Sequence, residues 1–314
     1  NMGGHAKLGQ SQYLIAEADE SDGSFLKLSP TLAVVTTLDE EHMDFYQTLN
    51  NMKSTFLQFL NKIPFYGAAI LCLDDANLQS LLPKIKKRTI TYGLTSQADY
   101  TARNISVEGL KTYFTVYHQD KKLGKILSGA LGRHNVCNTL AAVAVGMELN
   151  MDFLTIAKSL KNFSGVQRRF EILKQSESLI IVDDYGHHPI EIQATLSTAK
   201  EVWPERRLVV IFQPHRYSRT EHQMENFYSA FNDADQLLLL DIYSAGEKVI
   251  EGVHSNKIAE GVKEFGHKNV EYIGCTESVV PYLQKILKPG DVVMALGAGN
   301  IGELSHKLVT HFND

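Results

Sequence analysis

Short apolar runs recur along this chain, and a cluster of polar residues follows many of them. The first runs are YLIAEA (13–18), LAVVTTL (32–38), AAILCL (68–73) and TITYGL (89–94). Each has the length and composition of a buried β-strand. Buried strands that alternate with helical segments are typical of a parallel sheet with helices on both faces. We therefore predict an α/β fold.

The same pattern restarts after NFSGVQRRFE (162–171), which we interpret as a hinge. Before the hinge, strand-like alternation runs from Tyr100 to Leu127, and RHNVCNTLAAVAVGMEL is typical of a helix. Beyond it, helices are predicted over 189–201 and near 220–232. The predicted strands there are LIIVDD, RLVVIFQ, QLLLLDIY, VEYIG and DVVMALG. We predict two domains: residues 1–165, resembling the later part of an α/β unit, and residues 166–314, a complete one.

Composition excludes several classes of protein. The net charge of −5 provides no electrostatic footprint for nucleic acid, so we expect no nucleic-acid partner. The longest apolar runs are far too short to span a bilayer, so no membrane insertion is expected. Cys72, Cys137 and Cys275 form no CxxC pair, and we interpret them as free core thiols in a reducing cytoplasm.

Polar clusters follow the strands at one predicted edge. In open parallel sheets, ligands bind beyond the carboxyl ends of the strands. The clusters at these ends are EADESD, DEEHMD, DDYGHHP, QPHRYSR and GAGNIG. The sequence therefore predicts that they share an edge of their sheet.

The residue types leave several uses open. The acidic clusters around Glu17 and His42 fit either a Mg²⁺ site or solvated loops. Arg216 and Arg219 suit a phosphate or carboxylate. The hinge pair RR at 168–169 has the same chemistry, or is merely solvated.

The amides of Asn135 and Asn138 can bind a nucleoside base or cap a helix, and the sequence alone favours capping. VDDYGHHP (182–189) leaves metal binding, acid–base chemistry and substrate binding open.

GAGNIG (297–302) matches GxGxxG literally. Only 314 − 302 = 12 residues follow it, too few for the remainder of a dinucleotide-binding unit. We therefore reject a nicotinamide enzyme. We expect a tight strand-to-helix turn whose backbone N–H groups face the site.

Taken in order, these motifs strongly resemble the Mur ligase family over essentially the whole chain. The resemblance is carried by YLIAEADESDGSF, VVTTLDEEHMDFY, GRHNVCNTLAAVAV, FSGVQRRFE, VDDYGHHPIEI, FQPHRYSRT, YSAGE and GAGNIG. Two positions depart from the usual family pattern: Thr37, where Asn is usual, and Leu296, where Gln is usual. DDYGHHP with HRYSRT resembles the member that starts the peptide stem of bacterial peptidoglycan.

The resemblance implies a fold and a reaction. Residues 1–165 would be the remainder of a P-loop-type central ATPase domain, and residues 166–314 a C-terminal Rossmann-like doubly wound domain. Residues 1–50 contain no GxxGKT/S loop, so the chain resembles an N-terminally truncated ligase that is inactive alone. The whole enzyme would use ATP and Mg²⁺ to join L-alanine to the lactyl carboxylate of UDP-N-acetylmuramate through an acyl phosphate. A bacterial cytoplasmic protein, monomer or weak homodimer, is also implied.

The resemblance also implies roles for individual residues. Glu17 and His42 would bind Mg²⁺, and the catalytic residues would be His42, His187 and Arg216. Contacts to ATP would come from Asn135, Asn138, Arg168 and Arg169. Contacts to the muramoyl substrate and alanine would come from Tyr185, His187, Arg216 and Arg219. Two alternatives stay open: a non-catalytic fragment without the P-loop, and a related Mur or folylpolyglutamate-type amide ligase.

Overall fold

The computed structural model describes residues 6–163 and 165–312. Residues 1–5, Ser164 of the predicted hinge and residues 313–314 lie outside the described residues. The chain divides into two compact units. Unit 1 comprises Asn1–Ala130 and His134–Ser164, and unit 2 comprises Leu131–Arg133 and Gly165–Asp314. Among the described residues, no helix is both long enough and apolar enough to cross a membrane.

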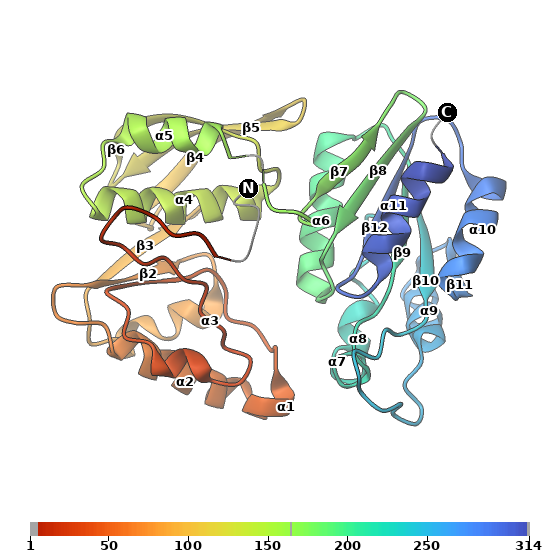
Figure 1. Cartoon of the computed structure of the whole chain (residues 1–314), viewed down its shortest axis with the longest axis horizontal. Coiled ribbons are helices and arrows are strands. Elements are labelled where there is room, and N and C mark those ends of the chain that lie inside the picture. Colours follow the sequence, from red (N-terminus) through yellow and green to blue (C-terminus); the bar gives the residue numbers. More distant parts are fainter. Residues whose placement is uncertain (1–5, 164, 313–314) are drawn as a thin grey trace. The chain divides into compact units, whose positions relative to one another are not determined.

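Unit 1 is built on a mixed sheet with the order β1-β2-β3-β4-β5-β6 (Figure 1). Strands β1 to β4 pair in parallel, and β4, β5 and β6 form an antiparallel meander. The alternation predicted from Tyr100 onward is this meander. The strands are β1 (Leu32–Val35), β2 (Ala68–Cys72), β3 (Thr89–Gly93), β4 (Tyr100–Glu108), β5 (Lys111–His118) and β6 (Lys121–Ser128).

Helices pack against this sheet around one core. The core joins apolar side chains of α2 and α4, such as Phe56, Leu60 and Leu140, to strand residues such as Ile70 and Val116. The helices are α1 (Met43–Tyr46), α2 (Leu49–Asn61), α3 (Ala76–Gln79), α4 (Arg133–Glu148) and α5 (Phe153–Lys161), with short 3₁₀ helices η1 (Ser24–Lys27) and η2 (Leu82–Lys84).

The strand predicted over residues 13–18 is absent, so that prediction is wrong. This segment has no regular structure, and Leu14 and Ile15 are each 93% exposed. A strand needs a neighbour for its backbone N–H and C=O groups. Strand β1, at the edge of the described sheet, pairs only with β2. An apolar run that pairs with no strand stays extended and irregular.

Unit 2 is a doubly wound sheet with the order β11-β10-β9-β12-β8-β7. All neighbours are parallel except β7, which pairs antiparallel with β8 at one edge. Strand β7 was not predicted, because its sequence EILKQ is too polar to be recognised as a strand. The strands are β7 (Glu171–Gln175), β8 (Leu179–Asp184), β9 (Leu208–Phe212), β10 (Gln236–Leu240), β11 (Val270–Gly274) and β12 (Asp291–Leu296).

Helices cover both faces of this sheet, as predicted. Helices α10 and α11 pack on alternate strand residues such as Ile181, Val209 and Val293, and α6 lies on the other side (Figure 1). Burial on both faces explains why β8, β9 and β12 are continuous apolar runs. The helices are α6 (Pro189–Val202), α7 (Tyr217–His222), α8 (Met224–Phe227), α9 (Ser255–Glu264), α10 (Val279–Ile286) and α11 (Ile301–His311), with 3₁₀ helix η3 (Thr276–Ser278).

The helix predicted near 220–232 is wrong in detail. Two short helices, α7 and α8, meet at Gln223, whose backbone (φ −100°, ψ 8°) is not helical. Gln223 is 2% exposed, and its side-chain oxygen accepts a hydrogen bond from Asn226 at 2.7 Å. A buried polar residue with its own partner interrupts the helix, which an apolar pattern does not reveal.

Strand β12 has a special place in unit 2. It is the last strand in the chain, yet it pairs with both β8 and β9. The carboxyl ends of β8, β9 and β12 are therefore adjacent. This order brings DDYGHHP, QPHRYSR and GAGNIG together, as the sequence predicted.

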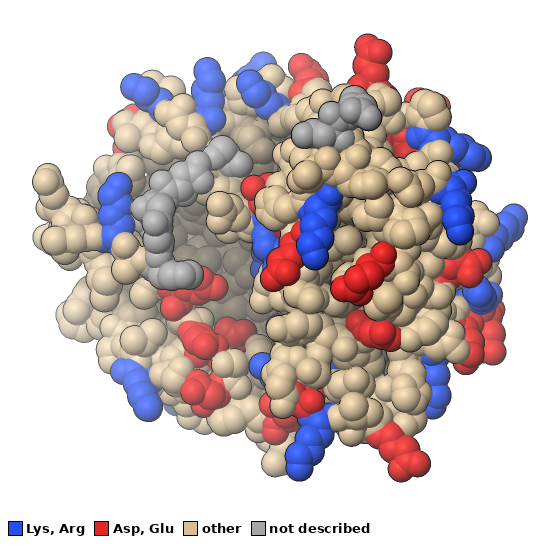
Figure 2. Space-filling view, turned by 45° about the vertical axis from the view of Figure 1, so that its right-hand side comes forward, with Lys and Arg blue, Asp and Glu red and all other residues tan. Residues whose placement is uncertain are grey.

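Charged groups are spread over the surface. Figure 2 shows acidic and basic side chains interspersed on the face in view. The net charge of −5 is therefore not gathered into one patch on that face.

The three cysteines are not equally buried. Cys72 is buried and Cys137 is half-buried, whereas Cys275 is exposed, so the prediction of three core thiols is wrong for Cys275. The Sγ atoms of Cys72 and Cys137 lie within 4.8 Å of each other. That contact lowers the pKa of the Cys72 thiol and raises the pKa of the Cys137 thiol.

Candidate functional site

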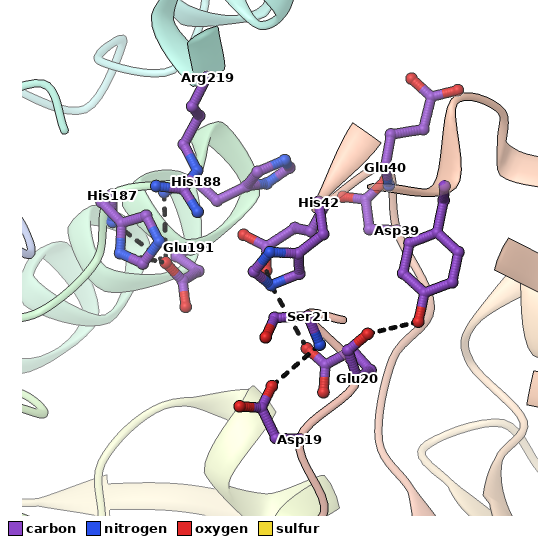
Figure 3. A network of polar contacts seen from close by, with 12 residues as sticks. Asp19, Glu20, Ser21, Asp39, Glu40, His42, His187, His188, Glu191 and Arg219 are labelled. Atoms are coloured by element: carbon purple, nitrogen blue, oxygen red, sulfur yellow. Dashed lines mark hydrogen bonds and ion pairs between the residues drawn. The ribbon is translucent and has the colours of Figure 1, made fainter. Parts of the chain in front are cut away.

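An acidic cluster forms in unit 1 from Glu20, Glu41 and His42. The His42 Nε2 atom lies 3.6 Å from Glu20 Oε1 and 3.9 Å from Glu41 Oε2. Figure 3 shows the Glu20 and His42 side chains pointing toward each other from two loops. The three ligand atoms lie within 4.8 Å of one another, a spacing that a metal ion could bridge.

Local turns position these groups. Asp19 Oδ1 accepts the Ser21 N–H at 2.9 Å, and the hydrogen bonds from Ser21 lower the pKa of Asp19. The Tyr46 hydroxyl donates to the Glu20 carbonyl. His42 precedes α1 with φ 55°, an uncommon conformation for a residue with a Cβ atom. The chain thus accepts backbone strain where it presents the imidazole.

Carboxylates and an imidazole, each partly exposed, fit a hard divalent cation that keeps several waters. Glu17, however, is exposed and is not a member of the acidic cluster. Its expected place was the carboxyl end of the strand over residues 13–18, which is not formed. Sequence reasoning chose the first acid of EADESD, while the structure brings the third acid, Glu20, to His42.

Asn135 and Asn138 lie on one side of α4. The Asn138 amide donates to Asn135 Oδ1 at 3.3 Å. Because α4 begins at Arg133, both residues lie inside the helix and not at its N-cap position. Capping, which the sequence alone favoured, is therefore wrong. The pair remains a candidate for contacts with a nucleoside.

In unit 2, Asp183 and Asp184 organise the end of β8. Asp184 is 4% exposed and accepts hydrogen bonds from the N–H groups of Phe170 (2.7 Å) and Gly186 (2.8 Å). Burial raises the pKa of this carboxyl group. Asp183 is 1% exposed and accepts from Arg168 Nε at 3.0 Å. Both aspartates orient neighbouring groups.

Tyr185 and His187 follow directly. Their rings meet edge to face at 5.3 Å, and the guanidinium groups at 168 and 169 lie 5.2 and 5.4 Å from the Tyr185 ring. Glu191 accepts the backbone N–H groups of His187 (3.0 Å) and His188 (3.2 Å), shown in Figure 3. Although burial opposes it, the charge of His187 and the neighbouring Arg169 lower the pKa of Glu191.

The two arginines of the 168–169 pair differ. Arg168 is engaged within unit 2, where Nε contacts Asp183 and Nη2 donates to the Gly297 carbonyl at 2.6 Å. Arg169 is half exposed and contacts Glu191 at 3.1 Å. Arg168 therefore ties the end of β8 to the end of β12, while Arg169 retains more solvent access.

At the end of β9, Arg219 reaches back to a histidine that sequence reasoning did not single out. Arg219 Nη1 lies 3.2 Å from His215 Nδ1, and the His215 ring stacks on Tyr243 at 5.6 Å. Arg216 has φ 69°, and its N–H donates to the Tyr243 carbonyl at 2.8 Å. His215 lies inside the QPHRYSR motif, directly before Arg216, and only this position could have marked it.

Burial, together with the positive charges of Arg219, His187 and Arg216, lowers the pKa of His215 to about 4. The His215 imidazole therefore binds a proton near pH 6.5 in the unfolded chain, but only near pH 4 in the folded chain. We expect the free energy of unfolding to fall as the pH drops through this window. The measurement is denaturant unfolding followed by the fluorescence of Trp203, the single tryptophan.

The non-titrating variant His215→Asn should show a smaller loss between pH 6.5 and about 4. Glu191 and Glu247, whose pKa values are lowered, act at the acidic end of this range in both proteins. An identical pH dependence in the two proteins would contradict the assignment to His215.

The GAGNIG turn is packed against Gln213, another residue of unit 2. Gly297 has φ 147°, and a Cβ atom there would lie 2.7 Å from the Gln213 carbonyl oxygen. The Ile301 N–H donates to Gln213 Oε1 at 3.2 Å, and Gln213 Nε2 donates to Asn300 at 2.9 Å. We expected the backbone N–H groups of this turn to face the site. This expectation is wrong for Ile301, because its N–H group donates to Gln213.

Comparison with known proteins places the chain in a class of ATP-dependent amide ligases. Residues 5–146 match the Mur ligase middle domain, and residues 168–299 match the Mur ligase glutamate ligase domain. The chain belongs to the Mur ligase family.

Its relatives point to one member of that family. The chain is 52% identical over 309 residues to the UDP-N-acetylmuramate–L-alanine ligase of Geotalea uraniireducens, covering 98% of this chain and 67% of that protein. It is 52% identical over 301 residues to the enzyme of the same name from Geobacter sulfurreducens, covering 96% and 65%. The chain thus spans about two thirds of these relatives.

Solved structures agree with the fold. The UDP-N-acetylmuramate–alanine ligase of Thermotoga maritima superposes with a TM-score of 0.76 at 26% identity, covering 94% of this chain and 63% of that one. A MurF ligase of the same organism, solved in complex with ADP, gives 0.68 at 17% identity over 90% of this chain and 63% of that one. The second likeness shows the fold alone.

Proposed function

We propose that the protein to which this chain belongs joins L-alanine to the lactyl carboxylate of UDP-N-acetylmuramate with consumption of ATP. The observation that carries the proposal is the 52% identity, over 309 residues, to a relative of that name. A folylpolyglutamate-type activity or another Mur activity is the weaker alternative. No feature of the described residues favours it.

The reaction is a two-step exchange at a carboxyl carbon. The lactyl carboxylate oxygen attacks the γ-phosphorus of ATP, and ADP leaves. The amine of L-alanine then attacks the acyl carbon of the acyl phosphate, and inorganic phosphate leaves as the amine loses a proton. Every participant before the second attack is anionic, so the protein's main tasks are positioning and charge neutralisation.

We assign these tasks to the two units separately. In unit 1, Asn135 and Asn138 contact the nucleoside of ATP, and Glu17 and His42 bind Mg²⁺. Bound Mg²⁺ supplies positive charge next to the phosphate oxygens. The acidic cluster supports a cation near His42, and Glu20 and Glu41 add charge to that position.

In unit 2, Tyr185, His187, Arg216 and Arg219 bind the muramoyl substrate and alanine. The adjacent carboxyl ends of β8, β9 and β12 support this grouping. Arg169 is the better candidate for an ATP phosphate, because Arg168 already contacts a buried aspartate. Arg168 then serves as a positioning residue. From the family resemblance alone, we also propose a cytoplasmic monomer or weak homodimer.

The test is phosphate release dependent on both L-alanine and UDP-N-acetylmuramate. It compares this chain with a polypeptide extended to the length of its relatives. The extended protein should be active with L-alanine and not with glutamate. The chain alone should not turn over ATP, because residues 1–50 carry no P-loop motif. Activity with glutamate alone would instead favour the alternative ligases.

Metal binding gives a separate prediction. In the extended protein with ADP, Glu17→Gln and His42→Ala should each weaken Mn²⁺ binding about tenfold or more, because each removes a ligand. The measurement is a titration followed by the paramagnetic resonance of unbound Mn²⁺. Glu20→Gln is the parallel variant. A strong effect of Glu20→Gln with none from Glu17→Gln would transfer the carboxylate role to Glu20.

A further inference from the structure

A second group of possible metal ligands lies in unit 1, apart from the acidic cluster. It consists of Cys72, Asp74 and Cys137, whose ligand atoms all lie within 4.8 Å of one another. Cys72 ends β2, Asp74 follows two residues later, and Cys137 lies on α4. None of the three has a role in the proposed reaction.

The spacing of these atoms matches a tetrahedral thiolate–carboxylate site. Bonds of about 2.3 Å to sulfur and about 2.1 Å to oxygen place a sulfur and an oxygen about 3.6 Å apart around a tetrahedral zinc ion. The Cys137 Sγ atom lies 3.5 Å from Asp74 Oδ2. The Sγ atoms of Cys72 and Cys137 lie within 4.8 Å of each other. Small shifts would suffice to place an ion among the three atoms.

The carboxylate is held in place by its surroundings. Asp74 Oδ2 accepts the Leu94 N–H at 2.6 Å, and Oδ1 accepts the Thr95 N–H at 3.0 Å. A Cβ atom on Gly93 would lie 2.7 Å from Asp74 Oδ1, so glycine makes room for this carboxylate. Backbone hydrogen bonds of this kind fix a ligand before the metal arrives.

Access and ligand type indicate which ion fits. Asp74 is exposed and Cys137 is half-buried, so an ion can enter from solvent. Cys72 is buried and forms the inner side of the site. Two thiolates favour a soft or borderline ion such as Zn²⁺ or Cd²⁺ over Mg²⁺. Three protein ligands leave the fourth tetrahedral position to water.

We propose that Cys72, Asp74 and Cys137 form a binding site for one Zn²⁺ or Cd²⁺ ion, separate from the Mg²⁺ site. On binding, each thiol loses its proton to solvent and each sulfur forms a bond to the ion. No electron is transferred, so no oxidant is required. Cys137 lies between Asn135 and Asn138 in α4. An ion bound by Cys137 would therefore lie at the same edge of the unit 1 sheet as this asparagine pair.

The first test uses the unmodified chain, reduced with a phosphine and freed of metal. Cd²⁺ is added, and alkylation of each cysteine is followed by mass spectrometry. Cd²⁺ should slow alkylation of Cys72 and Cys137 and leave Cys275 unchanged. Equal effects on all three thiols, or no effect on any, would overturn the proposal.

The second test measures affinity with matched variants. Wild-type protein and Cys275→Ser should bind one equivalent of Cd²⁺ with equal affinity. Cys72→Ser, Cys137→Ser and Asp74→Asn should each bind about tenfold more weakly or worse, because a lost ligand costs at least as much as a lost supporting hydrogen bond. Circular dichroism confirms that each variant is folded. Unchanged affinity in both cysteine variants of the site would exclude it.

Discussion

Replacing Arg216 by alanine in the extended protein is expected to lower the rate of alanine-dependent phosphate release by about 100- to 1,000-fold. A positioned donor to a charge that develops in the transition state is typically worth this factor. Arg216 lies directly beyond β9, where its backbone is fixed by the hydrogen bond to Tyr243 and adopts a positive φ. The measurement is the initial rate at saturating ATP, L-alanine and UDP-N-acetylmuramate.

Arg206→Ala is the matched control. Arg206 precedes the amino end of β9, where it donates to the carbonyls of Glu177 and Gly290 at 3.2 and 3.3 Å. It has the same charge and flanks the same strand, but at the amino end of β9, whereas Arg216 follows the carboxyl end. Its variant should keep the rate within a few-fold, with some loss of stability. Equal losses in both variants would show that Arg216 acts through the fold and not on the substrate.

Replacing Arg168 by alanine is expected to lower the free energy of unfolding of unit 2 by about 3–5 kcal/mol, the usual cost of leaving a buried charge without its partner. Asp183 is 1% exposed and would lose its contact with Arg168 Nε. Trp203 fluorescence reports this unit, because its ring stacks on Phe170 at 5.7 Å.

Ser305→Ala provides the comparison. Ser305 Oγ donates to the other oxygen of Asp183 at 3.2 Å, and loss of this hydrogen bond to a carboxylate should cost about 1.5–3 kcal/mol. Arg168→Ala together with Asp183→Asn should recover part of the lost stability, because the unpaired charge is gone. If Arg168→Ala lowers the free energy of unfolding no more than Ser305→Ala does, the ion pair with Asp183 does not hold the ends of β8 and β12 together.

The sequence was sufficient for the features that depend on burial. Strands β8, β9 and β12 are apolar throughout because both faces of their sheet are covered, and such runs are readily recognised. The meeting of their polar ends follows from parallel pairing. Features that depend on partners were missed. The run at 13–18 is as apolar as a strand but pairs with none, and β7 is too polar to be recognised.

The site was predicted to the same degree. The motifs identified loops that the structure brings to adjacent strand ends in unit 2, but not which side chains meet. Glu20 approaches His42 because a turn at Asp19–Ser21 and a hydrogen bond from Tyr46 orient its loop. His215 acquires its low pKa from burial and from arginines on the following helix. Both effects depend on three-dimensional proximity, which a motif does not encode.

The central position of β12 has a consequence for how unit 2 is made. A ribosome delivers β8, β9, β10 and β11 before residues 291–296, so β8 and β9 must wait for the neighbour that joins them. Pairings between segments this distant in sequence form slowly, and open strand edges invite aggregation in the meantime. The proposed substrate-binding loops therefore come together only after β12 has been synthesised. A chain cut short before β12 would retain every residue of DDYGHHP and HRYSRT and still be unable to align them.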